Sequence, residues 1–212
     1  MNASASATDL RAGLFLLLAL VVAATRSHHF AALPDASWAV FFVAGFHFAG
    51  DARGLRAALT GGAVRWAFPL LMMLAVLVDF FVITAQGMDF WSHYCVSAAY
   101  WFLVPSYAAL WIGGAWLRVH SRGAHLRDLG LLAASAVVAT SACYLLSNGS
   151  FYWLSPSVPA RSLAGWMANL GDWYLPFLQT TLVYIGIAAA LHVLAAQALR
   201  WLAPAQSDAL RR

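Results

Sequence analysis

The chain has 212 residues, of which 63% are hydrophobic and only 9% charged, and its formal net charge is +4. A soluble domain of this length cannot bury so much apolar surface, so the composition excludes an ordinary soluble protein and indicates one embedded in lipid. The cations are arginines scattered between apolar segments, and none of them cluster in a way that could follow a phosphate backbone. We therefore expect no nucleic-acid partner.

Six apolar segments follow one another along the chain. They cover residues 10–26, 36–50, 63–86, 92–118, 129–147 and 175–201. Because about 20 apolar residues carry a helix across the hydrocarbon core, these segments predict an all-α integral membrane protein with six transmembrane helices in one domain, 1–212. The first segment also has the length of a signal-peptide core, but Val22-Ala23-Ala24 is a poor cleavage site, so we expect a retained helix.

The arginines predict how the helices are oriented. With the N-terminus inside, the arginines of the inner side are Arg11, Arg53, Arg56, Arg118, Arg122, Arg127, Arg200, Arg211 and Arg212. Only Arg26 and Arg161 fall on the outer side. Since basic residues concentrate on the cytoplasmic side of a membrane, both termini are expected in the cytoplasm and the protein in the cytoplasmic membrane.

This orientation collects the polar and aromatic candidates for a binding site at the outer face. The outer connections hold His28, His29 and Asp35, then Asp89, Trp91, His93, Tyr94 and Cys95, then Asn148, Trp153, Arg161, Trp166, Asn169, Asp172, Trp173 and Tyr174. The longest connection is 148–174, and loops of that length carry function or a helix of their own. Within it, Ser162–Leu170 is predicted to form a separate amphipathic helix at the interface.

Cys95 is the residue with the most reactive chemistry. It is predicted to lie one turn into the fourth helix, just below the outer surface, with His93 before it and Tyr100 after it. A thiolate is a soft ligand for transition metals and a nucleophile, whereas a cysteine in a membrane helix otherwise serves in packing. The neighbouring histidine and tyrosine favour the functional interpretation. Cys143, among Ala, Ser and Leu, is interpreted as a packing residue.

Two further features of the helices are candidates for function. Asp79 lies inside an apolar segment, where a carboxylate is costly and marks either a ligand or ion pathway or a structural hydrogen bond to a neighbouring helix. Ala19 and Ala23 are four residues apart on the first helix, a spacing of small residues that lets another helix approach closely. The chain contains no Walker A loop, so active transport would need an energy source outside it.

Three stretches together resemble a known family. They are Ser27-His28-His29-Phe30, then Leu33-Pro34-Asp35-Ala36-Ser37-Trp38-Ala39-Val40-Phe41-Phe42, and Cys95 followed by Tyr100. These residues resemble the cobalamin-specific solitary S-components, which are relatives of the substrate-binding subunits of energy-coupling factor transporters. Length, number of spans and orientation agree with that family over essentially the whole chain.

The resemblance implies a six-helix S-component-like bundle that binds cobalamin at its outer face. It implies that the Cys95 thiolate ligates the corrinoid cobalt on its upper axial side and can decyanate cyanocobalamin. Asp79 and Tyr100 are the candidates for the carboxylate and tyrosine of the family pattern. His28, His93, Arg161 and Trp166 are expected at the same site from their predicted location. The implied partner is an energy-coupling module, a transmembrane coupling protein with two ATPases, with Ala19 and Ala23 in the docking surface.

Two other functions stay open on the sequence. In a membrane enzyme, Cys95 would be the nucleophile, and its base would come from His28 or His29, because His93 two residues away points about 200° from Cys95 on a helix. In a haem- or quinone-binding subunit, His28 and His192 would be the ligands. These two histidines are predicted at opposite ends of the bilayer, which disfavours a shared haem.

Overall fold

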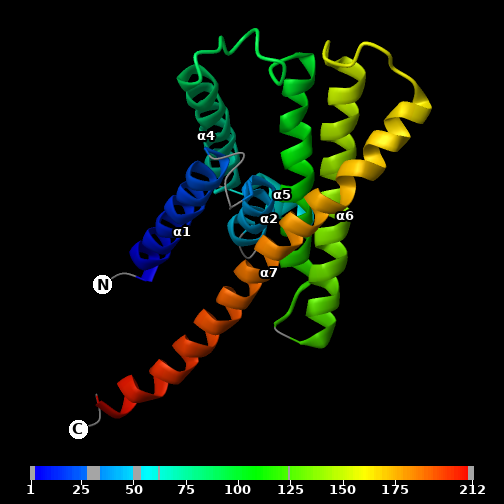
Figure 1. Cartoon of the computed structure of the whole chain (residues 1–212). Coiled ribbons are helices and arrows are strands. Elements are labelled where there is room, and N and C mark those ends of the chain that lie inside the picture. The colour runs from blue at the N-terminus through cyan, green and yellow to red at the C-terminus, as the bar shows by residue number, and fades with distance from the viewer. Residues whose placement is uncertain (1–2, 28–33, 50–53, 62, 124, 210–212) are drawn as a thin grey trace.

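A computed structural model describes residues 3–27, 34–49, 54–61, 63–123 and 125–209, and every regular element in these ranges is a helix, as the sequence predicts. The elements are α1 (Ala3–Arg26), α2 (Ser37–Phe48), α3 (Leu55–Thr60), α4 (Val64–Ala85), the 3-10 helix η1 (Ala98–Phe102), α5 (Leu103–His120), α6 (Leu126–Leu154) and α7 (Leu163–Ala209). Figure 1 shows α7 crossing the bundle diagonally.

Four of these helical stretches are long and apolar enough to cross a membrane. They are Val64–Ala85, Ala98–His120, Leu126–Leu154 and Leu163–Ala198, and they make the chain a multi-pass membrane protein by length and composition. The other two predicted spans correspond to α1 and α2. The stretch of α1 from Asp9 to Arg26 carries three charged residues. At 12 residues α2 is about 18 Å long, shorter than the roughly 30 Å hydrocarbon core.

The short helix α2 forms the centre of the molecule. It contacts α1, α4, α5 and α7, and most of its side chains are buried. Its closest neighbour is α5, where a Cβ added at Gly45 would collide with the Trp111 carbonyl and one added at Gly114 with the Phe42 carbonyl. Small residues permit such backbone contact between helices, so these two glycines set how α2 and α5 cross.

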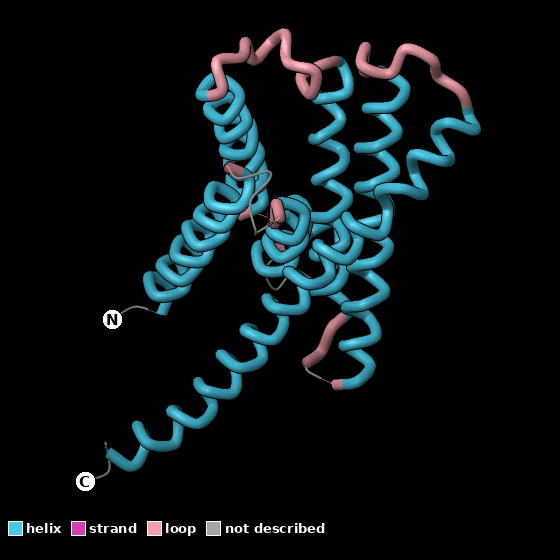
Figure 2. Tube along the Cα trace, viewed as in Figure 1, coloured by secondary structure: helices cyan, strands magenta, loops and turns pink. Residues whose placement is uncertain are grey.

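The connections divide between two ends of the bundle. Figures 1 and 2 show the α4–η1 connection and the α6–α7 connection together at the top, the α5–α6 connection at the bottom, and both chain termini at the lower left. The two upper connections are those that the sequence analysis assigns to the outer face and that carry Cys95 and Arg161.

The helix boundaries differ from the prediction at the upper end. Of the predicted connection 148–174, only residues 155–162 lie outside helices, because α6 continues to Leu154 and α7 begins at Leu163. Of the predicted helix Ser162–Leu170, residues from Leu163 on are helical, but they form the first part of α7 and not a separate helix. Bonds to α6 hold this first part of α7: the Tyr144 hydroxyl donates to the Leu170 carbonyl at 3.0 Å, and the Asn148 amide donates to Asn169 at 2.7 Å.

Candidate functional site

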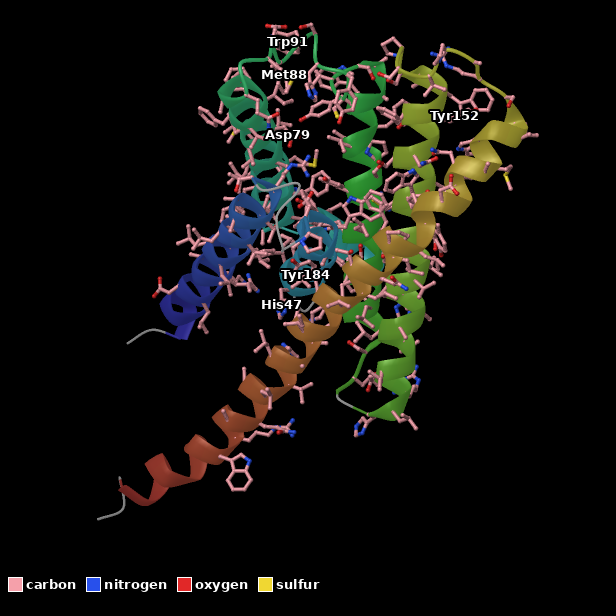
Figure 3. The ribbon with its side chains drawn as sticks, viewed as in Figure 1. His47, Asp79, Met88, Trp91, Tyr152 and Tyr184 are labelled. Atoms are coloured by element: carbon pink, nitrogen blue, oxygen red, sulfur yellow. The ribbon has the colours of Figure 1, made fainter. Side chains whose placement is uncertain are left out.

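A buried arginine at the end of α1 organises the polar interior of the upper half. Arg26 is only 6% exposed. Its Nε donates to Asp79 Oδ1 and its Nη2 to Asp79 Oδ2, both at 2.7 Å. Such a fork-to-fork pair is the strongest geometry between arginine and a carboxylate. It joins α1 to α4, and Figure 3 shows Asp79 in the upper half of the bundle.

The remaining guanidinium nitrogen reaches two further helices. Arg26 Nη1 donates to Asp35 Oδ2 at 3.0 Å, to Ser37 Oγ at 3.3 Å and to the Tyr107 hydroxyl at 2.8 Å. Asp35 Oδ1 in turn accepts from the Ser37 backbone N–H at 2.9 Å and from its hydroxyl at 2.6 Å. These bonds fix the start of α2 and one face of α5 to the same cation.

Tyr100 links this network to the segment that carries Cys95. Its hydroxyl donates to Asp79 Oδ2 at 2.8 Å, and it lies in η1, five residues after Cys95. We call Arg26, Asp35, Ser37, Asp79, Tyr100 and Tyr107 the Arg26 network. It contains one guanidinium and two carboxylates. Taking charges out of water is costly unless they are paired and hydrogen-bonded, and here the ion pairs of Arg26 with Asp35 and Asp79 supply that pairing.

The hydrogen bonds of Asp79 favour one of the two roles predicted for it. Both of its oxygens accept hydrogen bonds from side chains on other elements, two from Arg26 and one from Tyr100. This arrangement agrees with the structural alternative considered for a carboxylate inside an apolar segment. Asp79 is hydrogen-bonded within the protein, and its bond to Tyr100 places it next to the Cys95 segment.

Cys95 lies outside any helix, in the connection between α4 and η1, which corrects the prediction that it lies one turn into a helix. Gly87 follows α4 with a positive φ of 76°. Asp89 Oδ1 accepts from the Ser92 N–H at 2.9 Å, and Ser97 Oγ accepts from the Ala99 N–H at 3.3 Å. These local side-chain bonds give the backbone an alternative to the helix, so helical residues begin only at Ala98.

The Cys95 thiol is half-buried and lies within electrostatic reach of the Arg26 network. Burial raises the pKa of the thiol and Asp79 raises it further, whereas a hydrogen bond with Tyr94 and the Arg26 charge lower it. The same hydrogen bond raises the pKa of the Tyr94 phenol. Cys95 is therefore a protonated thiol at neutral pH, and it must lose its proton to act as a ligand or nucleophile.

His93 lies against the backbone of Cys95. Its Nδ1 accepts from the Cys95 N–H at 3.3 Å, and its ring centroid is 4.5 Å from that of Tyr94. This hydrogen bond occupies Nδ1 with the amide, so His93 is a poor base for the thiol. The reason predicted from helix geometry does not apply, because the two residues lie outside a helix.

The other predicted site residues fall in a separate group on α6, α7 and their connection. The Arg161 guanidinium donates to the Ser155 carbonyl at 2.8 Å, and the Trp166 indole N–H donates to Asn148 Oδ1 at 3.2 Å. These bonds do not connect them to the Arg26 network. His28 and His29 lie outside the described residues.

Sequence reasoning missed Arg26 and Tyr107 as members of the site. Arg26 was counted among the outer arginines that report orientation, but it is buried and paired. A usable signal was present: an arginine at the end of one apolar segment and an aspartate inside another must find partners within the bundle.

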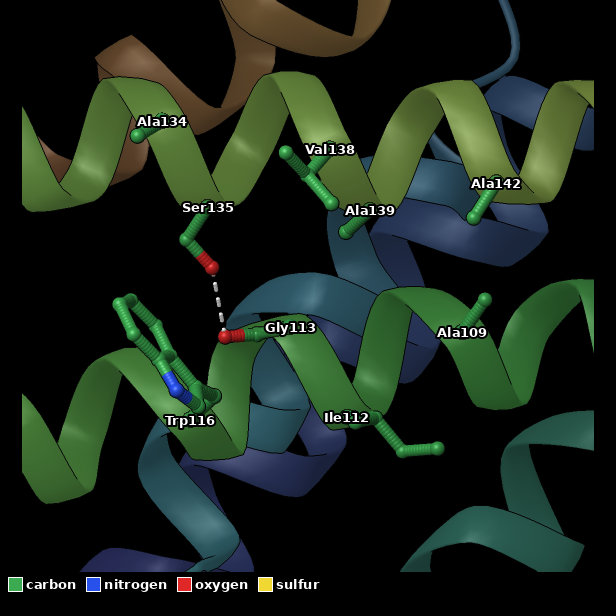
Figure 4. Close-up of a pocket in the computed structure, with 9 residues that line it drawn as sticks. All are labelled: Ala109, Ile112, Gly113, Trp116, Ala134, Ser135, Val138, Ala139 and Ala142. Carbon is green, nitrogen blue, oxygen red and sulfur yellow. Dashed lines mark hydrogen bonds between the residues drawn. The ribbon is translucent and has the colours of Figure 1, made fainter.

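The described residues contain no group of three or more His, Cys, Asp or Glu side chains that could hold a metal ion. The clearest groove lies elsewhere, between α5 and α6, with a volume of about 470 Å³. Figure 4 shows its lining of mainly small and apolar side chains, among which the Ser135 hydroxyl donates to the Gly113 carbonyl at 2.8 Å. This groove offers little polar recognition.

The sequence matches no family model and no curated protein. What the fold and the site define is a class: an all-α multi-pass membrane protein whose charged interior adjoins a half-buried thiol at one end of the bundle.

Proposed function

We propose that this protein takes up cobalamin across the cytoplasmic membrane, and that the Cys95 thiolate ligates the corrinoid cobalt. The observation that carries the proposal is the position of Cys95, a half-buried thiol in an upper connection beside the Arg26 network. The proposal combines this position with the resemblance to cobalamin-specific S-components. His28, His93, Asp79, Tyr100, Arg161 and Trp166 belong to the proposed site, with Asp79 acting through its hold on the Cys95 segment.

One protein ligand is sufficient for this metal. A corrin ring already supplies four nitrogen ligands, so cobalt needs only axial donors, and a set of three protein ligands is unnecessary. With cyanocobalamin, the Cys95 sulfur donates an electron pair to Co(III) and cyanide leaves with its own pair. The thiol proton goes to cyanide, giving hydrogen cyanide and a cobalt–thiolate bond, and the cobalt stays Co(III).

The proposed membrane arrangement has six spans and cytoplasmic termini. Arg26 is buried in the protein and is therefore not an exposed charge on the outer side. Arg161 is then the one exposed arginine assigned to the outer side. The enclosure of α2 by other helices lets this short segment count as a span without contacting lipid along its whole length.

The proposed energy source is a coupling module docked on α1. Ala19 lines a groove between α1 and α4 with a volume of about 240 Å³, together with Phe15, Leu70, Met73, Leu74 and Leu77. Ala19 and Ala23 are half-buried on α1, so a partner helix would meet them at the edge of this groove.

The visible spectrum of the purified protein tests the cobalt–thiolate bond. Protein from cells fed cyanocobalamin is expected to carry a corrinoid with an altered spectrum, and Cys95→Ala is expected to abolish that alteration. Cys143→Ala is the matched control, because Cys143 is the other cysteine and is fully buried. A colourless wild type, or a corrinoid spectrum unchanged in Cys95→Ala, would contradict the assignment, and a Soret band would favour haem. Uptake is tested separately, by growth on cobalamin of a strain that cannot import it.

Reporter fusions test the orientation. Fluorescent protein fused after Arg212 is expected to fluoresce, and alkaline phosphatase inserted after Trp91 is expected to be active, because Trp91 is exposed in the upper connection (Figure 3). The reverse pattern would place the Cys95 end in the cytoplasm and overturn uptake from outside.

The two alternatives find less support in the described residues. A membrane enzyme would need a base for Cys95, and His93 Nδ1 is bonded to the backbone. For a haem subunit, the proposed ligand His28 lies outside the described residues, and the ring of His192 lies beside that of His47, with centroids 5.3 Å apart.

A further inference from the structure

Hydrogen bonds connect Arg26 to the element that follows the Cys95 segment. The guanidinium bonds both oxygens of Asp79, Asp79 accepts from the Tyr100 hydroxyl, and Tyr100 is the middle residue of η1, which begins three residues after Cys95. Arg26 itself belongs to α1, 69 positions before Cys95 in the sequence.

We infer that Arg26 is a positioning residue for Cys95, acting through Asp79 and Tyr100. The inference rests on the proposed function, in which Cys95 is the reactive group, and adds a residue that the family resemblance does not assign. In this arrangement the arginine anchors the carboxylate that holds Tyr100, and Tyr100 in turn holds the end of the Cys95 segment.

The geometry explains why an arginine suits this position. Its fork satisfies both Asp79 oxygens while Nη1 is left to bind Asp35, Ser37 and Tyr107. A lysine carries the same charge on a single nitrogen and cannot hold Asp79 at two points while reaching the other groups. Arg26 therefore sets the place of the Cys95 segment through Asp79 and Tyr100.

The test is the limiting rate of Cys95 alkylation by N-ethylmaleimide at high pH, in full-length Cys143→Ala protein in nanodiscs without corrinoid. Arg26→Gln and Arg26→Lys are both expected to raise this rate several-fold, because neither side chain holds both oxygens of Asp79. Arg161→Gln is the control, since that arginine bonds a backbone carbonyl outside the Arg26 network. A role in stability alone would lower the melting temperature and leave the rate of the folded protein unchanged, so unchanged rates in both folded Arg26 variants would overturn the inference.

A variant at Tyr100 tests the positioning of the Cys95 segment if the Arg26 variants do not fold. Tyr100→Phe removes the bond between η1 and Asp79 but leaves the ion pair intact, and it is expected to raise the limiting alkylation rate at high pH several-fold. Tyr144→Phe is the control, because it removes a comparable interhelical hydroxyl bond between α6 and α7. Equal limiting rates in wild type, Tyr100→Phe and Tyr144→Phe would contradict positioning through Tyr100. Since no corrinoid is used, these outcomes are independent of the cobalt assignment.

Discussion

Gly114→Ala is expected to prevent the bundle from assembling. A Cβ at Gly114 would overlap the Phe42 carbonyl and crowd the Phe46 backbone nitrogen, so the new methyl group would meet backbone atoms of α2. Backbone of a buried helix cannot move aside as a flexible side chain can. We expect a loss of roughly 3 kcal/mol or more in the free energy of unfolding, at or above the upper end for overpacked cores. Gly45→Ala is expected to act similarly, through the Trp111 carbonyl.

The measurement is the melting temperature and the monodisperse fraction of the detergent-purified protein. Gly130→Ala in α6 and Gly186→Ala in α7 are matched controls, because nothing lies within 4 Å of a Cβ at either position. Alanine favours a helix over glycine by about 1 kcal/mol, so the controls are expected to be neutral or slightly stabilising. If the Gly114→Ala protein had the same melting temperature as these controls, α2 and α5 would not cross as closely as described.

Arg26→Met is expected to destabilise the upper half of the molecule. The substitution removes the cation and leaves Asp79 buried, and Asp35 partly buried, without it. Breaking a buried ion pair by removing one partner costs about 3–5 kcal/mol, because the remaining charge has lost its compensation. The double variant Arg26→Met/Asp79→Leu removes both charges of the bidentate pair and is expected to recover part of the loss. Recovery stays incomplete because Asp35 keeps its carboxylate.

Thermal unfolding of wild type, the two single variants and the double variant measures the coupling between Arg26 and Asp79. Non-additivity is expected, with the double variant more stable than the sum of the single losses requires. Additive losses would show that the two side chains do not form the buried pair. Arg161→Met is the control, since that arginine bonds a backbone carbonyl in an exposed connection and is expected to change stability little.

The helices themselves were largely predictable, because a long apolar run in a membrane protein satisfies its backbone within one segment. The regions of α4, α5, α6 and α7 follow from this rule. The ends of the helices were predicted less well than their central parts. The predicted apolar segment 92–118 includes Cys95, but Asp89 and Ser97 bond nearby backbone N–H groups and keep this part out of the helix. Short polar side chains such as these determine where a helix starts by bonding nearby backbone groups. The mean hydropathy of a segment does not contain that information.

The candidate site was predictable in its chemistry but not in its connections. Cys95, Asp79 and Tyr100 were singled out because a thiol and an intramembrane carboxylate are unusual, and the structure brings Asp79 and Tyr100 into contact beside the Cys95 segment. Arg161 and Trp166 were assigned to the same site from their predicted location. Their bonds instead belong to α6, α7 and their connection.

The sequence by itself determined that this is an all-α multi-pass membrane protein. Composition and the length of apolar runs are local properties, and they decide whether a helix can span the hydrocarbon core. The sequence also determined which side chains are capable of ligation. Only the tertiary structure decided that Arg26 pairs with Asp79, 53 residues away, and that the short α2 occupies the centre. Those facts depend on how helices cross, where two glycines admit a neighbouring backbone and a buried charge must find its partner.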